Sequence, residues 1–482
     1  MLFDRVKPLD QILEAAEKKG LKRQLGAFDL TMLGVGAIIG TGIFVLTSVA
    51  ATKAGPGMMY SFILAAIVCA LTALVYAEIA SMVPVSGSAY TYSYAVMGEL
   101  IAWSVGWALI LEYAVAASAV AVGWSGYMNG VLERHGLGLP VAFQVGSFSS
   151  VKAADGSLVH GTFNLLAFLI SLLVTWLLVR GTSKSAKVTA ALVLVKIAAL
   201  VIFIIFALPA VKTTNFEPML PLGWNGVSVA AATIFFAYVG FDAVSTAAEE
   251  TVNPNRNIPL GLIGSLVICT IFYLLVAYAA VGAVGAQPGG ELATSKEALA
   301  FVLKKINHPL AADLVAAAAS IALPSVVLMM IFGQTRILFT MARDGLMPNA
   351  FAAVHETYQT PHVVTWITGI LVAIFASQLN VDVLADISNA GTLYAFFAVS
   401  LGVMILRVQQ PNRVRPFKTP LVWIIAPASA IGCAFLFWKL GGSVPMPVGR
   451  DVSTKEFFVI WTVIGFVVYF AYARRRSLLA KV

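Results

Sequence analysis

Four closely spaced glycines interrupt an apolar stretch near the start of the chain, and the backbone groups that they free could form a binding site. The stretch covers residues 30–51, long enough to cross a bilayer, and its middle carries Gly34, Gly36, Gly40 and Gly42. Each glycine costs about 1 kcal/mol relative to alanine inside a helix, so we expect a break at mid-membrane. Non-helical backbone persists there only where it lines a cavity or is buried in protein. Freed amides can bind a carboxylate and freed carbonyls an ammonium, so the pattern predicts an amino acid as substrate.

A second apolar stretch, residues 226–247, carries a similar interruption at Gly240 and Asp242. Asp242 is expected either to cap the second half-helix by accepting freed amides or to contact the substrate. Phe236 lies one turn before this break and could cover a bound substrate, with ordinary packing as the alternative. Glycines can also serve close helix packing alone, but that explanation accounts poorly for two interrupted spans at this separation.

Two charged residues are expected inside the membrane. Lys196 lies half-way along residues 188–208, where a lysine costs roughly 2.5–3.5 kcal/mol on insertion scales. Burial disfavours its charged form, which predicts a proton carrier that could also replace a sodium ion by donating to helix carbonyls. Glu112, in the middle of residues 98–130, needs a partner. We expect a direct or water-mediated contact with Lys196; the alternatives are a static ion pair and a satisfied structural glutamate.

Residues 310–335 contain Pro324 and Ser325 at mid-membrane and could form a third wall of the site. The proline frees a carbonyl and the serine offers a hydroxyl, although a serine can also bond back to its own helix. The three cysteines lie in apolar segments without zinc-ligand spacing, and the few histidines fall in loops. Neither a metal nor a cofactor is expected.

The composition excludes a water-soluble globule. Hydrophobic residues make up 60% of the chain and charged residues 11%, against roughly 25% charged residues in soluble domains. An all-α polytopic membrane protein is therefore predicted. Twelve spans of about 20 residues can be placed, at 30–51, 58–83, 98–130, 163–179, 188–208, 226–247, 259–284, 310–335, 361–379, 383–406, 419–438 and 457–473.

The basic residues predict an orientation. With the N-terminus inside, 20 of the 31 lysines and arginines lie in inner segments and ten in outer ones. This bias fits the positive-inside rule with both termini cytoplasmic, so the net charge of +8 orients the protein and is no sign of nucleic acid. The first 28 residues are polar and basic, and no cleavable signal peptide is predicted. We expect a monomer in the lipid bilayer of the plasma membrane.

The two interrupted spans are five apart and run in opposite directions. Two five-span units that each open with a broken helix are typical of inverted-repeat transporters. The predicted units are a first repeat at 29–208, a second repeat at 225–406 and two further spans within 419–473, with cytoplasmic tails at 1–28 and 474–482.

Several motifs resemble a known family. They are L-K-R-Q-L-G-A-F-D-L at 21–30, G-A-I-I-G-T-G-I-F at 36–44, G-S-A-Y-T-Y-S-Y at 87–94, G-E-L-I-A-W at 98–103, G-W-A-L-I-L-E-Y at 106–113, F-F-A-Y-V-G-F-D at 235–242, E-E-T-V-N-P-N-R-N-I-P at 249–259, G-Q-T-R-I at 333–337 and M-A-R-D-G-L-M-P at 341–348. Together they are similar to the bacterial branch of the cationic amino acid transporters, in the amino acid–polyamine–organocation superfamily. The resemblance runs from about residue 20 to 410.

The resemblance implies a LeuT-like fold of two five-helix repeats, with broken helices 1 and 6, that works by alternating access. It also implies site roles: the substrate carboxylate on the amides of Gly40, Thr41 and Gly42, and the ammonium on the carbonyls of Ile38, Phe236 and Val239. It identifies Phe236 as an aromatic gate. It implies that Lys196 stands where sodium-coupled relatives hold sodium, hence proton coupling. The P-S pair at 324–325 departs from the small polar pair that is often seen there.

Two classes of function compete. A proton-coupled amino acid symporter is the first, and a membrane-embedded enzyme is the second. The chain has no H-E-x-x-H, no G-x-S-x-G and no P-loop, which favours transport. Within transport, a cationic amino acid or polyamine carrier or exchanger is the alternative. No acidic residue is evidently placed for a cationic side chain, apart from Glu112 and Asp242. We therefore favour small neutral L-amino acids such as alanine.

Overall fold

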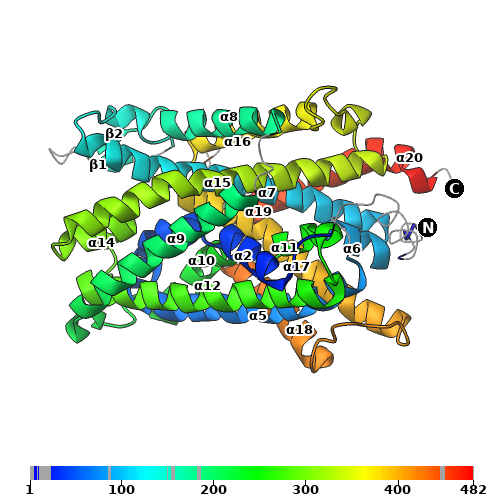
Figure 1. The fold of residues 1–482 in the computed structure, drawn as a ribbon, viewed down its shortest axis with the longest axis horizontal. Helices are drawn as coiled ribbons and strands as arrows, with labels where there is room; N and C mark the ends of the chain where they lie inside the picture. Colours follow the sequence, from blue (N-terminus) through cyan, green and yellow to red (C-terminus); the bar gives the residue numbers. More distant parts are fainter. Residues whose placement is uncertain are drawn as a thin grey trace.

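Long helices that run side by side form a bundle, and both termini lie at the same end of it (Figure 1). The computed structural model describes residues 5–7, 9, 23–84, 88–148, 150–152, 158–181, 186–445 and 451–480. Most of the predicted tail 1–28, the outer ends of the motifs at 21–30 and 87–94, and the last two residues of the tail 474–482 lie outside the described residues.

The helices follow the order of the predicted spans. The first half contributes α2 (Ala27–Ile38), α3 (Thr41–Phe44), α4 (Leu46–Ala54), α5 (Met58–Met82), α6 (Ser88–Val96), α7 (Glu99–Arg134), α8 (Leu165–Val179) and α9 (Ala186–Ala207). The second half contributes α10 (Gly223–Ile234), the 3-10 turn η6 (Phe235–Tyr238), α11 (Ala243–Thr246), α12 (Pro254–Val284), α13 (Glu291–Thr294), α14 (Ala298–Lys305), α15 (Pro309–Arg343), α16 (His362–Gln378) and α17 (Val381–Gln409). The chain then forms α18 (Val422–Lys439), α19 (Thr454–Val468) and α20 (Arg474–Arg476).

Two short antiparallel hairpins correct the all-α prediction. β1 (Ser150–Lys152) pairs with β2 (Leu158–His160), with Val151 opposite Val159. β3 (Ser443–Val444) pairs with β4 (Val452–Ser453). Both hairpins lie in connections between apolar helices, so they leave the helical bundle itself unchanged.

The number of membrane-crossing helices agrees only in part with the prediction. Within the described residues, nine helical segments are long and apolar enough to cross a membrane. Three further apolar helices, α2, α8 and α16, have 12, 15 and 17 residues, fewer than the roughly 20 residues that a bilayer requires. They occupy the places of predicted spans 1, 4 and 9. The count of twelve spans therefore stays a prediction.

Both predicted breaks are confirmed. The first helix stops at Ile38, and Ile39 and Gly40 continue in extended conformations before α3 begins at Thr41. The second helix, α10, tightens into η6 and then turns at Gly240, whose φ of +117° lies in a region that side chains other than glycine rarely adopt. Gly40 and Gly240 thus lie where the helices end, whereas Gly34 and Gly36 lie inside α2 and Gly42 lies inside α3.

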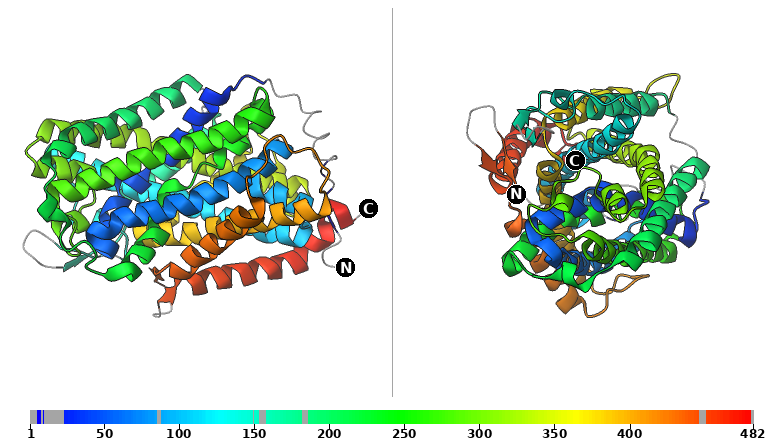
Figure 2. Two further views of the ribbon diagram at one scale, coloured as in Figure 1. Left: turned by 90° about the horizontal axis from the view of Figure 1, so that it is seen from below. Right: turned by 90° about the vertical axis from the view of Figure 1, so that its left-hand side faces the viewer.

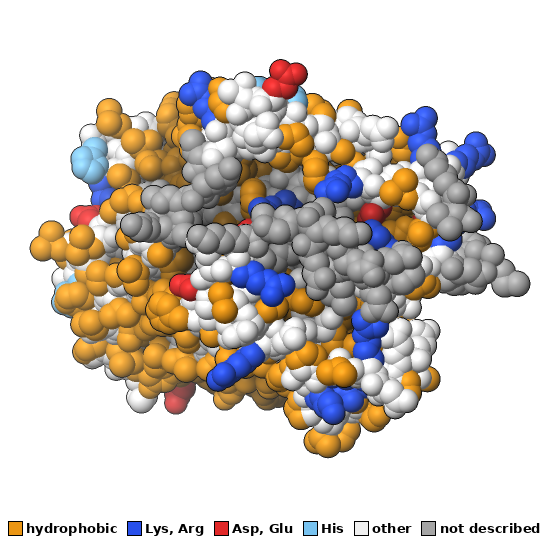
Figure 3. Space-filling view, turned by 45° about the vertical axis from the view of Figure 1, so that its right-hand side comes forward, with side chains coloured by type: hydrophobic (Ala, Val, Ile, Leu, Met, Phe, Trp, Pro, Cys, Tyr) orange, Lys and Arg blue, Asp and Glu red, His pale blue; other side chains and the backbone are white. Residues whose placement is uncertain are grey.

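The bundle buries a large apolar core together with many polar residues, and it also leaves large apolar side chains on its outer surface. α7 packs against α15 and α17, and α12 packs against α2 and α5. Figure 2 shows the bundle from two further sides. Large apolar side chains remain exposed on α12, α18 and α19, and hydrophobic side chains dominate one flank in Figure 3. Such a surface suits contact with lipid tails instead of water.

Candidate substrate site

A small cavity lies between the two breaks. Its walls come from α2 and α3, α7, the second break and α15, and the residues are Ala37, Ile38, Gly40, Thr41, Gly42, Val120, Phe236, Val239, Val326 and Met330. Six of the seven predicted substrate residues are thus brought together. The cavity volume is about 10 Å³, which is room for about one water molecule. A larger ligand would require the walls to move apart.

Thr41 is the one lining residue with a polar side chain, and its hydroxyl donates to the Val120 carbonyl at 3.5 Å, so the other polar groups of the lining residues are main chain. The first-turn amides of α3 have no partner within their own helix, and Gly40, Thr41 and Gly42 place them on the cavity wall. On the opposite side of the break, the carbonyl oxygen of Ile38 accepts a hydrogen bond of 2.8 Å from the Tyr273 hydroxyl. The same hydroxyl lies 2.9 Å from the carbonyl oxygen of Ala237. Tyr273 of α12 therefore bridges the two breaks.

Gly42 is the point of closest approach between the breaks. A Cβ atom at this position would overlap the Cα and Cβ atoms of Ala237 in η6. Since the neighbouring atom is backbone, it cannot move aside without shifting the second break. Gly42 thus has two roles. Its lack of a side chain lets the two interrupted helices meet, and its amide is predicted to bind the substrate carboxylate.

The third wall differs from the prediction. Ser325 does not line the cavity, and its hydroxyl donates to the Ala322 carbonyl of its own helix. Val326 and Met330, four residues apart on one face of α15, line it instead. A step of one residue turns a helix by about 100°, which is enough to move Ser325 off this face.

The carbonyl that Pro324 frees has a partner elsewhere. A proline cannot donate to the carbonyl four residues earlier, here that of Ser320. The indole of Trp124 donates to this oxygen at 2.7 Å. The proline therefore ties α15 to α7 beside the cavity and does not present its free carbonyl to a ligand.

Lys196 lies behind the first break. Its side chain is buried, and its ammonium donates to the Gly36 carbonyl at 2.8 Å. Gly36 belongs to the last turn of α2, where carbonyls lose their helical partners. A Cβ atom at Gly36 would overlap Cγ2 of Val193, so the glycine allows α9 to approach. The next residue, Ala37, lines the cavity, and Lys196 therefore supports the cavity from outside.

The prediction of a direct contact between Glu112 and Lys196 is wrong, because the Lys196 ammonium donates to the Gly36 carbonyl instead. Glu112 is buried in α7, and one carboxylate oxygen has no hydrogen-bond partner within the described part of the chain. Asp242 occupies the N-cap position of α11, but its side chain makes no capping hydrogen bond there, so the expected cap stays a prediction. The hydroxyl of Tyr113, the residue after Glu112, lies 3.4 Å from an Asp242 carboxylate oxygen. Neither acid lines the cavity.

A polar cluster that the sequence analysis missed joins three helices near the cavity. Lys53 at the end of α4 donates to the Thr233 hydroxyl at 2.6 Å and pairs with Asp386 of α17 at 3.3 Å. Thr233 in turn donates to Asp386 at 2.6 Å. Thr233 lies in α10, three residues before Phe236, so the cluster ties α4 and α17 to the helix that leads into the second break. The only feature of the sequence that could have indicated this cluster is Asp386, an aspartate within the predicted span 383–406.

Known proteins can now be compared with this chain. Residues 25–469 match the amino acid permease family. The chain is 45% identical to the branched-chain amino acid permease BcaP of Bacillus subtilis (strain 168), over 97% of each chain. It is 42% identical to the methylthioribose transporter of the same organism, over 99% of each chain. It is 36% identical to cationic amino acid transporter 4 of Arabidopsis thaliana, over 82% of this chain and 65% of that one. The chain therefore belongs to the amino acid permease family and is a membrane transporter, not an enzyme.

Proposed function

We propose that the chain is a proton-coupled symporter of L-amino acids that works by alternating access. The observation that carries this proposal is the cavity between the two breaks, whose lining residues offer main-chain amides and carbonyls and, as the one polar side chain, the Thr41 hydroxyl. Amides of Gly40, Thr41 and Gly42 would bind the carboxylate. Carbonyls of Ile38, Phe236 and Val239 would accept from the ammonium. These groups recognise what all amino acids share, so the side chain is selected by the remaining wall.

The remaining wall favours a small neutral side chain such as that of alanine. Ala37, Val120, Val326 and Met330 complete the lining, and none of the ten lining residues is charged. A cationic side chain would lack the acidic partner that a buried charge requires. The branched-chain amino acid permease at 45% identity fits neutral apolar substrates. Methylthioribose, carried by the relative at 42% identity, is the second candidate, because a cavity without charged side chains also suits a neutral sugar.

Proton coupling is assigned to Lys196. When protonated, its ammonium holds the Gly36 carbonyl at the end of α2. When neutral, it would release a donor–acceptor contact next to the cavity and let the first break reopen. Glu112 is the reserve candidate, since its buried carboxylate could also take up a proton. Protons and the amino acid are the proposed partners.

The proposed architecture is the inverted repeat of residues 29–208 and 225–406, followed by two spans within 419–473. Each repeat opens with one of the two interrupted helices. Both termini lie at the same end of the bundle (Figure 1), which is compatible with two cytoplasmic tails and an even number of spans. We propose a monomer in the plasma membrane.

Uptake into proteoliposomes tests this proposal. Labelled L-alanine should accumulate when protons are driven inward, without sodium, and should be recovered chemically unchanged. A one-to-one coupling converts each pH unit into about tenfold accumulation. Alanine that only exchanges against internal alanine, or that requires sodium, would contradict the proposed coupling.

A methyl group added to the cavity wall should sharpen selectivity for small substrates. In Gly40→Ala, the new Cβ would meet Val326 at 3.5 Å, an ordinary contact that the fold accommodates. We expect uptake of valine to fall about tenfold relative to alanine, as is typical when a pocket loses one methylene of space. Competition by valine against labelled alanine measures this ratio. The double variant Gly40→Ala/Val326→Ala should recover valine; an unchanged ratio in both variants would place the side chain elsewhere.

A further inference from the structure

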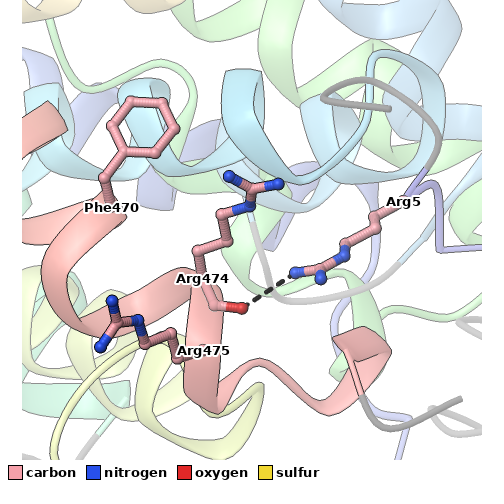
Figure 4. A pocket seen from close by; sticks show the side chains of 4 residues that line it. All are labelled: Arg5, Phe470, Arg474 and Arg475. Carbon is pink, nitrogen blue, oxygen red and sulfur yellow. Dashed lines mark hydrogen bonds between the residues drawn. The ribbon is translucent and has the colours of Figure 1, made fainter.

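A basic recess lies where the N-terminal segment meets the end of the last long helix. Its volume is about 460 Å³, and its lining residues are Arg5, Phe470, Arg474 and Arg475 (Figure 4). Arg474 and Arg475 begin α20, which follows α19 after a π-helical segment, Tyr469–Ala473, at the end of the bundle that carries both termini (Figure 1). Three arginines around one recess favour an anionic ligand.

Only one of the three arginines is neutralised by a described partner. Arg5 pairs with the buried carboxylate of Glu99 at 3.2 Å and also donates to the Arg474 carbonyl at 3.0 Å. These bonds fix its guanidinium at the edge of the recess. Arg474 and Arg475 are exposed, and within the described ranges no ion pair with an acid is found for either. The recess therefore keeps positive charge available to a ligand.

The recess continues into a surface suited to lipid chains. One face of α19 and the turn after it exposes apolar side chains at helical spacing, namely Val459, Ile460, Val463, Ile464, Val467 and Phe470. A face of this kind on a membrane helix meets acyl chains. Phe470 is the last member of this stripe and also lines the recess, and the guanidinium of Arg474 lies 6.0 Å from its ring centre. The apolar stripe and the basic recess thus meet at one residue.

We propose that this recess binds the phosphate of an anionic phospholipid, with the acyl chains along the apolar stripe of α19. Guanidinium groups match phosphate oxygens with paired donors, and basic pockets at the ends of membrane helices suit acidic headgroups. Arg474 and Arg475 contact the phosphate. Arg5, already bound to Glu99, closes the recess on the side of the N-terminal segment.

Lipid binding to the purified full chain in detergent tests the proposal. The probes are dioleoylphosphatidylglycerol and dioleoylphosphatidylcholine, and the readouts are bound lipid by native mass spectrometry and the shift in thermal unfolding. The anionic lipid should bind more tightly. Each arginine near a phosphate contributes about fivefold in affinity, so Arg474→Gln/Arg475→Gln should weaken binding about 25-fold.

A matched control is available at the end of α8. Arg180 is exposed and lies 4.1 Å from the ring centre of Trp176, an aromatic four residues earlier on its own helix, but it does not line the recess. Arg180→Gln should leave the binding of the anionic lipid unchanged. Arg474→Lys/Arg475→Lys keeps the charge and should bind more tightly than the glutamine variant, which keeps the test valid if the latter folds poorly.

Three results would overturn the proposal. Equal affinity for the two lipids would show that charge is not recognised. An equal thermal shift with glycerol phosphate or inorganic phosphate would show that the acyl chains and the stripe play no part. If Arg180→Gln and the double glutamine variant lost equal affinity for the anionic lipid, the effect would come from surface charge in general and not from a site at the end of α19.

Discussion

Replacing Gly42 by alanine is expected to weaken the binding of L-alanine roughly hundredfold while leaving membrane insertion intact. The added Cβ would overlap backbone and side-chain atoms of Ala237, so α3 and η6 must separate. Forcing an extra carbon into a packed contact costs about 3 kcal/mol, and this corresponds to roughly hundredfold weaker binding. The loss should be this large because the same displacement moves the amides of α3 away from the carbonyls of the second break.

The measurement is equilibrium binding of labelled L-alanine to protein that elutes as a single species from a sizing column. Gly402→Ala is the matched control, because a Cβ there, also within a buried helix, meets only the end of the Met97 side chain at 3.6 Å. It should bind like wild type. Wild-type affinity in Gly42→Ala would show that the breaks do not form the site.

Removing the ammonium of Lys196 is expected to uncouple transport from protons. In Lys196→Met the side chain keeps most of its apolar volume but loses the ammonium that donates to the Gly36 carbonyl. The groups that line the cavity are untouched, so substrate binding should persist. Accumulation driven by an inward proton gradient should fall from about tenfold per pH unit to simple equilibration.

Uptake into proteoliposomes with and without an imposed pH gradient gives the result, and Lys196→Ala should agree with Lys196→Met. Exchange of external against internal alanine serves as the internal control for folding. Undiminished accumulation in both variants would show that Lys196 is structural only, and Glu112 would become the leading candidate for the proton site.

The sequence predicts the breaks well because glycines and one aspartate stand out against an apolar background. Gly40 and Gly240 lie at the observed helix ends, and Phe236 and Val239 reach the cavity between them. This success has a local cause, since a glycine weakens its own helix whatever surrounds it.

The rest of the cavity could not be predicted in this way. Val120 and Met330 are apolar residues within apolar helices, so nothing in the sequence distinguishes them from their lipid-facing or packed neighbours. Ser325 looked more promising than Val326 because it is polar, but the rotation of α15 decides which of them faces the cavity. Rotation is set by packing against other helices, which no local pattern encodes.

The partners of buried polar groups depend on the same packing. Lys196 and Glu112 were expected together because they have opposite charges, yet the lysine bonds to a carbonyl freed by the first break. In the sequence, Tyr273 likewise cannot be distinguished from other aromatic residues of a membrane helix. Only the packing of α12 places its hydroxyl between the two breaks.

The most direct test of the whole account is competition for binding of labelled L-alanine to the wild-type protein. Propionate lacks the amino group, ethylamine lacks the carboxylate, and methylthioribose lacks both. If main-chain groups at the two breaks bind both ends of the substrate, only unlabelled amino acids with both groups should displace the label. Displacement by methylthioribose at the concentrations at which alanine competes would contradict the account.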